Sequence, residues 1–318
     1  MCELKALAAV LEEYGRPLVI KEAEIGEGIL LKVIASGICG RDLVIWRGGF
    51  RNLRPPLVMG HEIYGELDAR PYGIYGMESC GRCRFCLSGK ENLCEDTRFF
   101  GEKRPGGYAK FVAVEERNLF PLPDTQYEKY AAGVCPLATA IHSSKLAGVR
   151  AGDRVLVTGA GGGVGIHMIQ YLRLLGANVV SVTSPEKARY VSHYSDEVIT
   201  EREFSRYVGE VDHVMELVGS ETVNESLRAL KREGTLVLVG NVTGSEISLK
   251  RPALTIMREQ RIVGSAAYTK AETMEAVKLI HEGRIKPVFK RYRLDQVNEA
   301  LNELSRGSVL GRAVLVME

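Results

Sequence analysis

A run of glycines near the middle of the chain constrains its fold more than any other feature. The stretch VLVTGAGGGVGIHMIQ places Gly159, Gly161, Gly162, Gly163 and Gly165 between an apolar run typical of a buried strand and a helical pattern. Glycines at such a junction allow a tight turn and let the backbone approach a pyrophosphate, and the following helix offers N–H groups and its positive dipole end. This strand–turn–helix context predicts a dinucleotide-binding fold, which a glycine pattern alone would not.

The segment around this turn alternates between strand and helix patterns. Expected strands lie at 153–159, 178–184, 211–219, 235–242 and 261–267, and expected helices at 164–177, 185–194 and 225–234. Such alternation predicts parallel βαβ units in a doubly wound sheet. The first 135 residues instead carry short β-type runs separated by turns, and two amphipathic helices and a closing strand follow residue 265. The expected fold class is α/β, with a β-rich domain beside the nucleotide-binding one.

Length and composition limit the classes of protein that remain. A chain of 318 residues suggests two domains, and a net charge of +2 predicts no nucleic-acid partner. No apolar run reaches the roughly 18 residues needed to span a membrane, and the charged N-terminus is not typical of a secretory signal, so we expect a cytoplasmic protein. Four glutamines and eight asparagines form a low amide content, which favours a heat-adapted source.

The residues at the end of the second expected strand bear on the choice of cofactor. A site for NAD usually has an acidic residue there, about 20 residues after the glycines, to hold the ribose hydroxyls. This chain has Thr183 and Ser184 instead, with Lys187 close behind. A hydroxyl and an ammonium can bind a 2′-phosphate that a carboxylate would repel, so we predict NADP(H) in preference to NAD(H). The alternative is that Lys187 only solvates the first turn of a helix.

Four of the seven cysteines gather in the stretch CGRCRFCLSGKENLC. Cys80, Cys83, Cys86 and Cys94 have the spacing of a closed, tetrahedral zinc site that would fold a loop without doing chemistry. An iron–sulfur cluster is the rival interpretation, because a CxxCxxC run also serves such clusters. We favour a structural zinc ion, since no proline follows the last cysteine and the neighbouring domain is expected to bind a nicotinamide nucleotide.

Three further pieces contain residues that can bind metal. They are Cys39 in GICGRD, His61 and Glu62 in GHE, and Cys135 in GVCPLAT. A catalytic zinc ion needs about three cysteine, histidine or carboxylate ligands and one open position. Taken singly, each of these residues has a plainer interpretation as a core cysteine or a hydrogen-bonded histidine.

Taken together, the motifs resemble the zinc-containing medium-chain dehydrogenase/reductase family, the zinc alcohol dehydrogenases. GICGRD, GHE, the four-cysteine lobe, GGYAKFV, the stretch around Cys135, GAGGGVG and GRAVLV occur in the order typical of the family. The resemblance implies a GroES-like catalytic domain formed by 1–135 and 265–318, with its zinc lobe at 78–95. It implies a Rossmann dinucleotide-binding domain at 136–264.

The resemblance also implies roles for single residues. Cys39, His61 and Cys135 would bind the catalytic zinc ion, Glu62 would be able to enter its coordination sphere, and Asp42 would orient the histidine. The implied cofactor-binding positions are Thr139, Gly161, Gly162, Gly163, Val164, Thr183, Ser184, Lys187, Val218, Gly240, Asn241 and Arg312. The implied reaction is hydride transfer between NADP(H) and a small alcohol or carbonyl substrate that zinc polarises. By analogy with microbial members, a homo-oligomer, dimer or tetramer, is expected.

The chain departs from the family pattern at two places. Arg41 and Val44 stand where the family commonly has a hydroxyl and a histidine that relay the alcohol proton, and arginine cannot act as a base near neutral pH. The segment between GHE and the cysteine lobe is also shorter than usual. The pair Arg41–Asp42, together with VGNV and EGRIKPV, is similar to the archaeal acryloyl-CoA reductase-like branch. There an arginine would pair with a phosphate of coenzyme A, unless Arg41 pairs with a local carboxylate instead.

Three hypotheses follow. The leading one is an NADP(H)-dependent zinc alcohol dehydrogenase or ketone reductase, with Cys39, His61, Glu62, Cys135, Asp42 and Arg41 at the catalytic site. The second is an NADPH-dependent enoyl-CoA reductase. The third is a nucleotide-binding protein that has lost turnover along with the relay, although the retained metal-binding residues argue against it.

Overall fold

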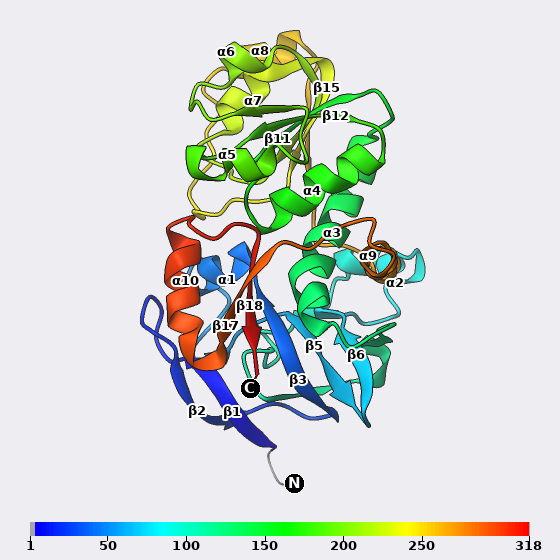
Figure 1. Cartoon of the computed structure of the whole chain (residues 1–318), viewed down its shortest axis with the longest axis vertical. Coiled ribbons are helices and arrows are strands. Elements are labelled where there is room, and N and C mark those ends of the chain that lie inside the picture. Colours follow the sequence, from blue (N-terminus) through cyan, green and yellow to red (C-terminus); the bar gives the residue numbers. More distant parts are fainter. Residues whose placement is uncertain (1–3, 318) are drawn as a thin grey trace. The chain divides into compact units, whose positions relative to one another are not determined.

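A computed structural model describes residues 4–317, which form two compact units (Figure 1). One unit combines the chain up to Cys135 with the residues from Thr269 onward, and the other is Pro136–Tyr268. The boundary expected after residue 264 precedes the observed one, because the segment that follows the last strand stays with the second unit. Among the described residues, no helix is both long enough and apolar enough to cross a bilayer.

The first unit is built on a sheet in which the two ends of the chain meet. Its strand order is β10-β6-β5-β3-β18-β17, with β9 also paired to β3, and a smaller sheet has the order β2-β1-β4. The strands are β1 Lys5–Leu11, β2 Val19–Glu24, β3 Ile29–Ile38, β4 Leu57–Val58, β5 Glu62–Leu67, β6 Arg70–Ile74, β9 Phe111–Val114, β10 Leu119–Pro121, β17 Phe289–Arg293 and β18 Arg312–Val316. The C-terminal β18 therefore lies between β3 and the edge strand β17 (Figure 1).

Helices and a small lobe complete this unit. The helices are α1 Gly40–Trp46, α9 Lys270–His281 and α10 Val297–Ser305, with short 3₁₀ turns η1 Glu91–Leu93, η2 Glu116–Asn118 and η3 Leu294–Gln296. The lobe contains β7 Met77–Glu78, α2 Arg84–Leu87 and β8 Arg98–Phe99. The long helix α3, Tyr127–Ala147, begins in this unit and continues into the second.

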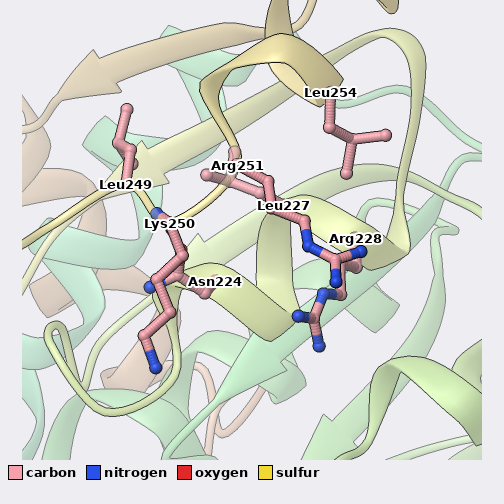
Figure 2. Close-up of a pocket in the computed structure, with 7 residues that line it drawn as sticks. All are labelled: Asn224, Leu227, Arg228, Leu249, Lys250, Arg251 and Leu254. Carbon is pink, nitrogen blue, oxygen red and sulfur yellow. Dashed lines mark hydrogen bonds between the residues drawn. The ribbon is translucent and has the colours of Figure 1, made fainter.

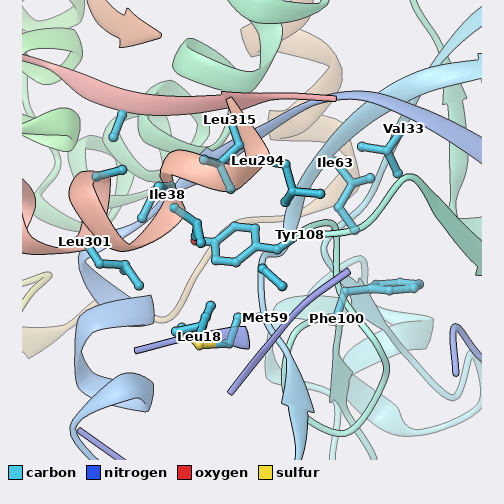
Figure 3. Close-up of a cluster of buried hydrophobic side chains, with 14 of the residues drawn as sticks. Leu18, Val33, Ile38, Met59, Ile63, Phe100, Tyr108, Leu294, Leu301 and Leu315 are labelled. Atoms are coloured by element: carbon cyan, nitrogen blue, oxygen red, sulfur yellow. The ribbon is translucent and has the colours of Figure 1, made fainter. Parts of the chain in front are cut away.

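The core of the first unit packs between the large sheet and helices α1 and α10. Tyr108 lies in the middle of this cluster, near Ile38, Met59 and Leu315 (Figure 3). All four are essentially excluded from solvent, and burying apolar surface contributes roughly 25 cal/mol per Å². Because β3 ends in this core at Ile38, the next residue, Cys39, is held in a fixed position.

The short segment after GHE folds as a tight hairpin. Strands β5 and β6 pair antiparallel from Ile63↔Ile74 to Leu67↔Arg70, which leaves only Asp68 and Ala69 in the turn. Both have positive φ, 50° and 60°, as a two-residue type I′ turn requires. The trimmed length of this segment is thus accommodated by the shortest kind of hairpin loop.

The second unit is a doubly wound parallel sheet, as expected for a Rossmann fold. Its strand order is β13-β12-β11-β14-β15-β16, so successive strands are added on one side of β11 and then, from β14 onward, on the other side. The strands are β11 Arg154–Thr158, β12 Asn178–Val182, β13 Glu197–Ile199, β14 Val211–Glu216, β15 Leu230–Leu238 and β16 Arg261–Gly264, and the helices are α4 Gly163–Leu174, α5 Pro185–Val191, α6 Ser205–Val208, α7 Val223–Ala229 and α8 Pro252–Met257. Helix α4 packs on β11 and β12, and α7 packs on β14 and β15.

All three helices predicted in this unit end before their predicted last residue, and one of them ends five residues early. The helix predicted at 225–234 ends at Ala229, and the residues that follow belong to β15. Leu230 is fully buried and pairs with Val211, and Glu233 has a φ of +56°, which a helix cannot contain. The prediction failed because Leu230 is required in the sheet core, which overrides the helix propensity of its charged neighbours.

Candidate metal centres and nucleotide site

Four possible metal ligands converge inside the first unit. One ligand atom from each of Cys39, His61, Glu62 and Cys135 lies within 4.8 Å of the others. The Cys135 Sγ is 3.9 Å from the His61 Nε2, which is 3.8 Å from the Glu62 Oε1. Three elements supply them: the residue preceding α1, the start of β5, and α3. Two sulfurs, an imidazole and a carboxylate are a donor set that suits zinc.

Asp42 lies behind the histidine of this cluster. Its Oδ2 accepts hydrogen bonds from the Cys39 backbone N–H at 2.7 Å and from the Tyr108 hydroxyl at 2.9 Å. Its Oδ1 makes no hydrogen bond to the residues that the structure describes, and it faces the His61 Nδ1 at 3.7 Å. Burial opposes protonation of His61, but the Asp42 carboxylate raises the pKa of that histidine well above its ordinary value. Asp42 is thus placed to fix the imidazole with its Nε2 toward the other ligands.

The buried carboxylate of Glu62 has surroundings that suit a bound cation. Neither carboxylate oxygen makes a hydrogen bond among the described residues, although the Oε1 is 3.0 Å from a terminal nitrogen of the buried Arg312. Burial raises the pKa of Glu62 to about 7, and Arg312 opposes this rise. A Cβ at Gly37 would lie 1.8 Å from the Glu62 Oε2, so only glycine leaves room for this carboxylate. The orphaned oxygens beside two sulfurs fit a bound metal ion.

The two cysteines of the cluster differ in their proton affinity. A hydrogen bond from Cys135 lowers the pKa of the Cys39 thiol well below its ordinary value, against the effect of burial, and Arg312 adds to the lowering. The pKa of Cys135 is raised by the same hydrogen bond and by burial. A thiolate at Cys39 is the form that binds metal.

Arg41 is engaged with its own neighbours. Its Nε donates to the Glu102 Oε1 at 2.5 Å, and its guanidinium lies 4.7 Å from the ring centres of both Phe50 and Phe99. The expected pairing with a local carboxylate is therefore what the structure shows. Sequence reasoning missed Glu102 and the two phenylalanines, because no motif links them to Arg41.

The four-cysteine lobe brings its sulfurs together as well. One sulfur from each of Cys80, Cys83, Cys86 and Cys94 lies within 4.8 Å of the others. Backbone N–H groups donate to two of them, from Cys80 to the Cys94 Sγ at 3.2 Å and from Cys83 to the Cys80 Sγ at 3.3 Å. A hydrogen bond from the Cys86 backbone lowers the pKa of Cys83 to about 6. Such N–H···S bonds favour thiolates and thus a metal ion held by cysteine alone.

The glycine turn of the second unit is crowded around its backbone. A Cβ at Gly165 would lie 2.3 Å from the Gly159 carbonyl oxygen, so helix α4 and strand β11 approach closely there. A Cβ at Gly161 would lie 2.6 Å from the Lys187 Cδ and 2.8 Å from the Thr183 Oγ1. These two predicted cofactor residues therefore lie directly beside the turn. Burial lowers the pKa of Lys187.

The remaining predicted cofactor positions fall into three places. Gly162 caps the N-terminus of α4, Gly163 and Val164 form its first turn, and Ser184 caps α5. Val218 and Asn241 lie in the loops after β14 and β15, which contact one another: the Val242 N–H donates to the Val218 carbonyl at 3.1 Å, and a Cβ at Gly240 would lie 2.4 Å from the Leu217 carbonyl oxygen. Thr139 lies in the part of α3 that belongs to the second unit, and Arg312 lies in β18 of the first unit.

A shallow hollow elsewhere in the second unit contains none of the predicted site residues (Figure 2). It is lined by Asn224, Leu227, Arg228, Leu249, Lys250, Arg251 and Leu254. Arg228 is already paired with Glu225. We assign no role to this hollow.

Comparison with known proteins agrees with this architecture. Residues 26–124 match the alcohol dehydrogenase GroES-like domain, and residues 163–282 match the zinc-binding dehydrogenase domain. An acryloyl-coenzyme A reductase from Sulfurisphaera tokodaii is 32% identical over 305 residues, covering 90% of this chain and 91% of that protein. An NAD-dependent alcohol dehydrogenase from Saccharolobus solfataricus is 29% identical, with 97% and 99% covered.

Solved structures give the same result. The crystal structure of AibC superposes with a TM-score of 0.88 at 34% identity and covers 99% of this chain and 96% of that one. Acetophenone reductase from Geotrichum candidum, solved in complex with NAD, gives a TM-score of 0.91 at 28% identity, with 99% and 98% covered. The chain thus belongs to the zinc-containing medium-chain dehydrogenase/reductase family and is an NAD(P)-dependent oxidoreductase.

Proposed function

We propose that this enzyme uses NADPH to reduce a carbon–carbon double bond conjugated to a thioester carbonyl, as in an enoyl-CoA. The observation that carries this proposal is Arg41, which stands at the usual relay position and is clamped by Glu102 and two phenylalanine rings. A guanidinium stays protonated and cannot accept the proton of an alcohol. The acryloyl-coenzyme A reductases of S. tokodaii and Metallosphaera sedula, at 32% and 31% identity, support the same substrate class.

We assign both metal sites to zinc. Cys39, His61 and Cys135 would bind the ion of the catalytic site, with Glu62 as an optional fourth ligand, and the four-cysteine lobe would hold a structural ion. A zinc ion held by the first set supplies Lewis-acid polarisation of a carbonyl oxygen. Asp42 would keep the histidine in place, and Arg312 would hold Glu62 away from an incoming substrate oxygen.

The proposed reaction needs no proton from residue 41. A nicotinamide nucleotide bound at the glycine turn would supply the hydride for the β-carbon and solvent would supply the proton for the α-carbon, so that the C=C bond becomes a single bond. The products are the saturated thioester and NADP⁺. In carbonyl reduction, by contrast, the new proton goes to the oxygen at the metal, which is the step the missing relay would serve. The arginine therefore handicaps C=C reduction less than C=O reduction.

The preference for NADP(H) rests on the end of β12. Thr183 and Lys187 lie beside the glycine turn, and no carboxylate occupies the position that would hold the ribose hydroxyls of NAD. Lys187 is half-buried beside this turn, so an ion pair between its ammonium and a 2′-phosphate would be partly shielded from water.

A zinc alcohol dehydrogenase or ketone reductase is the second candidate. The complete set of ligand-type residues at the first metal site favours it, as do alcohol dehydrogenases at 28–29% identity over nearly the whole chain. The metal-binding residues are compatible with both C=C and C=O reduction. We rank the enoyl-CoA reductase first because of Arg41.

One assay separates the two candidates. We would follow NADPH oxidation by the zinc-loaded enzyme against enoyl-CoA esters, ketones and aldehydes, and NADP⁺ reduction against primary and secondary alcohols. We expect turnover with enoyl-CoA and at most weak turnover with alcohols. Turnover with ketones and alcohols alone would establish the second candidate and overturn the first. Metal analysis in parallel should give two zinc ions per chain, and visible absorbance of an iron–sulfur cluster would contradict the lobe assignment.

The setting of the enzyme is proposed on the same basis. Among the described residues, the cysteines at the two metal sites form no disulfide, as is usual for metal-binding cysteines in a reducing compartment, and this supports a cytoplasmic protein. The low amide content and the similarity to an alcohol dehydrogenase from the hyperthermophilic archaeon Aeropyrum pernix, at 28% identity, support a thermophilic source. An exposed sheet edge at β16 supports a homo-oligomer, either a dimer or a tetramer.

A further inference from the structure

A fully buried carboxylate in the second unit has no part in the site described so far. Glu216 is the last residue of β14 and has 0% exposure. Its Oε1 accepts from the Thr158 hydroxyl at 2.7 Å, the Val218 and Gly219 N–H groups at 3.0 Å each and the Thr222 hydroxyl at 2.6 Å, and its Oε2 accepts from the Ser226 hydroxyl at 2.6 Å. Such a set of donors needs a group that only accepts, and among neutral and ionised side chains an ionised carboxylate meets that need best.

The position of Glu216 in the sheet gives this network its meaning. Thr158 ends β11 and Glu216 ends β14, the two parallel neighbours at which the order of strand addition reverses. The Thr158 hydroxyl donates to Glu216 and accepts from the Leu217 N–H at 3.0 Å, so it bridges the two strand ends. In open α/β sheets, ligands bind at the carboxyl ends of the strands beside this reversal point.

The same residue also holds the neighbouring loop. The Glu216 carbonyl accepts from the Val239 and Gly240 N–H groups at 3.0 and 3.2 Å, and its side chain fixes the N–H groups of Val218 and Gly219. A Cβ at Gly219 would lie 2.7 Å from the Asn241 Oδ1, so the two loops are in close contact. Glu216 therefore holds three predicted cofactor positions in place: Val218 and Gly240 through hydrogen bonds, and Asn241 through its contact with Gly219.

We propose that Glu216 is a positioning residue for the nicotinamide nucleotide, acting through the loops after β14 and β15. This inference rests on the proposed function, because it assumes that the reversal point binds the cofactor. Glu216 itself does not touch the cofactor. Its carboxylate fixes the position of the loop backbone at the strand ends. Without it, the N–H groups of Val218 and Gly219 would lose their acceptor, and the loop would shift so that these groups could hydrogen-bond to water.

The central test compares three variants with the wild-type holoenzyme. Glu216→Ala removes the acceptor. Glu216→Gln keeps one carbonyl oxygen for the N–H groups, and its amide can donate to the Ser226 hydroxyl, which can turn to accept. Leu236→Ala is the matched control, because Leu236 is fully buried in β15 of the same sheet and makes none of these bonds. We would measure the NADPH dissociation constant by fluorescence titration, the zinc content, and amide exchange of the peptide 217–222.

We expect Glu216→Ala to weaken NADPH binding about tenfold or more, the change that corresponds to loss of a buried hydrogen-bond acceptor. Amide exchange at 217–222 should rise and zinc content should stay at the wild-type level. Glu216→Gln should restore affinity to within about threefold. Leu236→Ala should lower the melting temperature but leave the dissociation constant unchanged.

Two results would overturn the inference: unchanged NADPH affinity in Glu216→Ala, or an equal loss of affinity in Leu236→Ala. If Glu216→Ala does not fold, the double variant Thr158→Val/Thr222→Val removes two donors while keeping side-chain shape, and unchanged affinity and exchange there would also refute it. A wild-type enzyme that binds neither NADPH nor NADH would refute the proposed function as well, which distinguishes the two failures.

Discussion

Single residues around the metal ligands have no spare volume, and Gly37 shows this most sharply. A Cβ at this position would point at the Glu62 carboxylate. It would also lie 2.4 Å from the Ala131 carbonyl oxygen of α3. A methyl group there would push β3 away from α3, the helix that carries Cys135. The glycine of the GIC motif is thus explained by a close approach of three elements.

We therefore expect Gly37→Ala to empty the first metal site. Zinc content should fall from two ions per chain to one, activity should be lost, and stability should drop by about 1–3 kcal/mol because the site is overpacked. Gly40→Ala is the control, since a Cβ there meets nothing within 4 Å. Metal analysis and thermal unfolding measure both variants, and a Gly37→Ala enzyme with full zinc would refute the close-packing argument.

Arg41 yields a second residue-scale prediction. Arg41→Ser removes the guanidinium and restores a hydroxyl at the relay position, so we expect alcohol oxidation to rise about tenfold or more. Glu102→Gln is the control, because it loosens the arginine and leaves the relay missing. Steady-state rates with secondary alcohols and NADP⁺ provide the measurement. Equal rates in Arg41→Ser and wild type would mean that the proton takes another route.

Lys187 predicts a pH dependence of cofactor choice. Burial lowers the pKa of this lysine, and only its protonated form pairs with a 2′-phosphate. As pH rises through the lowered pKa, the charge is lost and NADPH affinity falls, whereas NADH affinity is unaffected. The dissociation constant for NADH divided by that for NADPH should therefore fall several-fold as the pH is raised. In Lys187→Met this ratio should be small at every pH. A ratio that is constant with pH in the wild type would contradict the role of this lysine.

At the scale of elements, the β5–β6 hairpin contains a correctable strain. Ala69 adopts a φ of 60°, a conformation that costs an L-residue about 1–2 kcal/mol and costs glycine almost nothing. Ala69→Gly should therefore raise the free energy of unfolding by up to about 1 kcal/mol. Ala23→Gly, in the regular strand β2, should lower it. Chemical denaturation of both variants is the measurement, and destabilisation by Ala69→Gly would show that the turn is not strained.

The elements also show what sequence could and could not predict. The βαβ alternation and the glycine turn could be predicted from the sequence, because buried parallel strands and the helix after Gly162 have strong local sequence patterns. The end of α7 was not predicted, because Leu230 is buried in the sheet as the first residue of β15. The convergence of Cys39, His61 and Cys135 came from a family resemblance, since their spacing alone carries no geometry. Glu216 and Glu102 were missed because the partners of each lie on other elements.

At the scale of the whole molecule, the edge of the second unit's sheet predicts an assembly. Strand β16 is the last in its sheet, and Ile256, Met257 and Ile262 are exposed on or beside it. An exposed strand edge with apolar neighbours tends to pair with another chain. We expect Ile262→Lys combined with Met257→Glu to reduce the oligomeric state measured by light scattering, while the Cys80 lobe keeps its zinc. Ile20→Lys, at an exposed position of the other unit, is the control. A wild-type monomer would refute this prediction.

The pairing of β18 with β3 also bears on how the protein is made. The second unit is one continuous stretch, Pro136–Tyr268, so a ribosome delivers all of it before synthesis ends. The metal-binding unit cannot close its sheet until Arg312–Val316 has emerged to lie beside β3. The proposed zinc ligands Cys39 and Cys135 are made well before β18, so we expect their thiols to be exposed to oxidation or to a wrong metal until β18 joins the sheet.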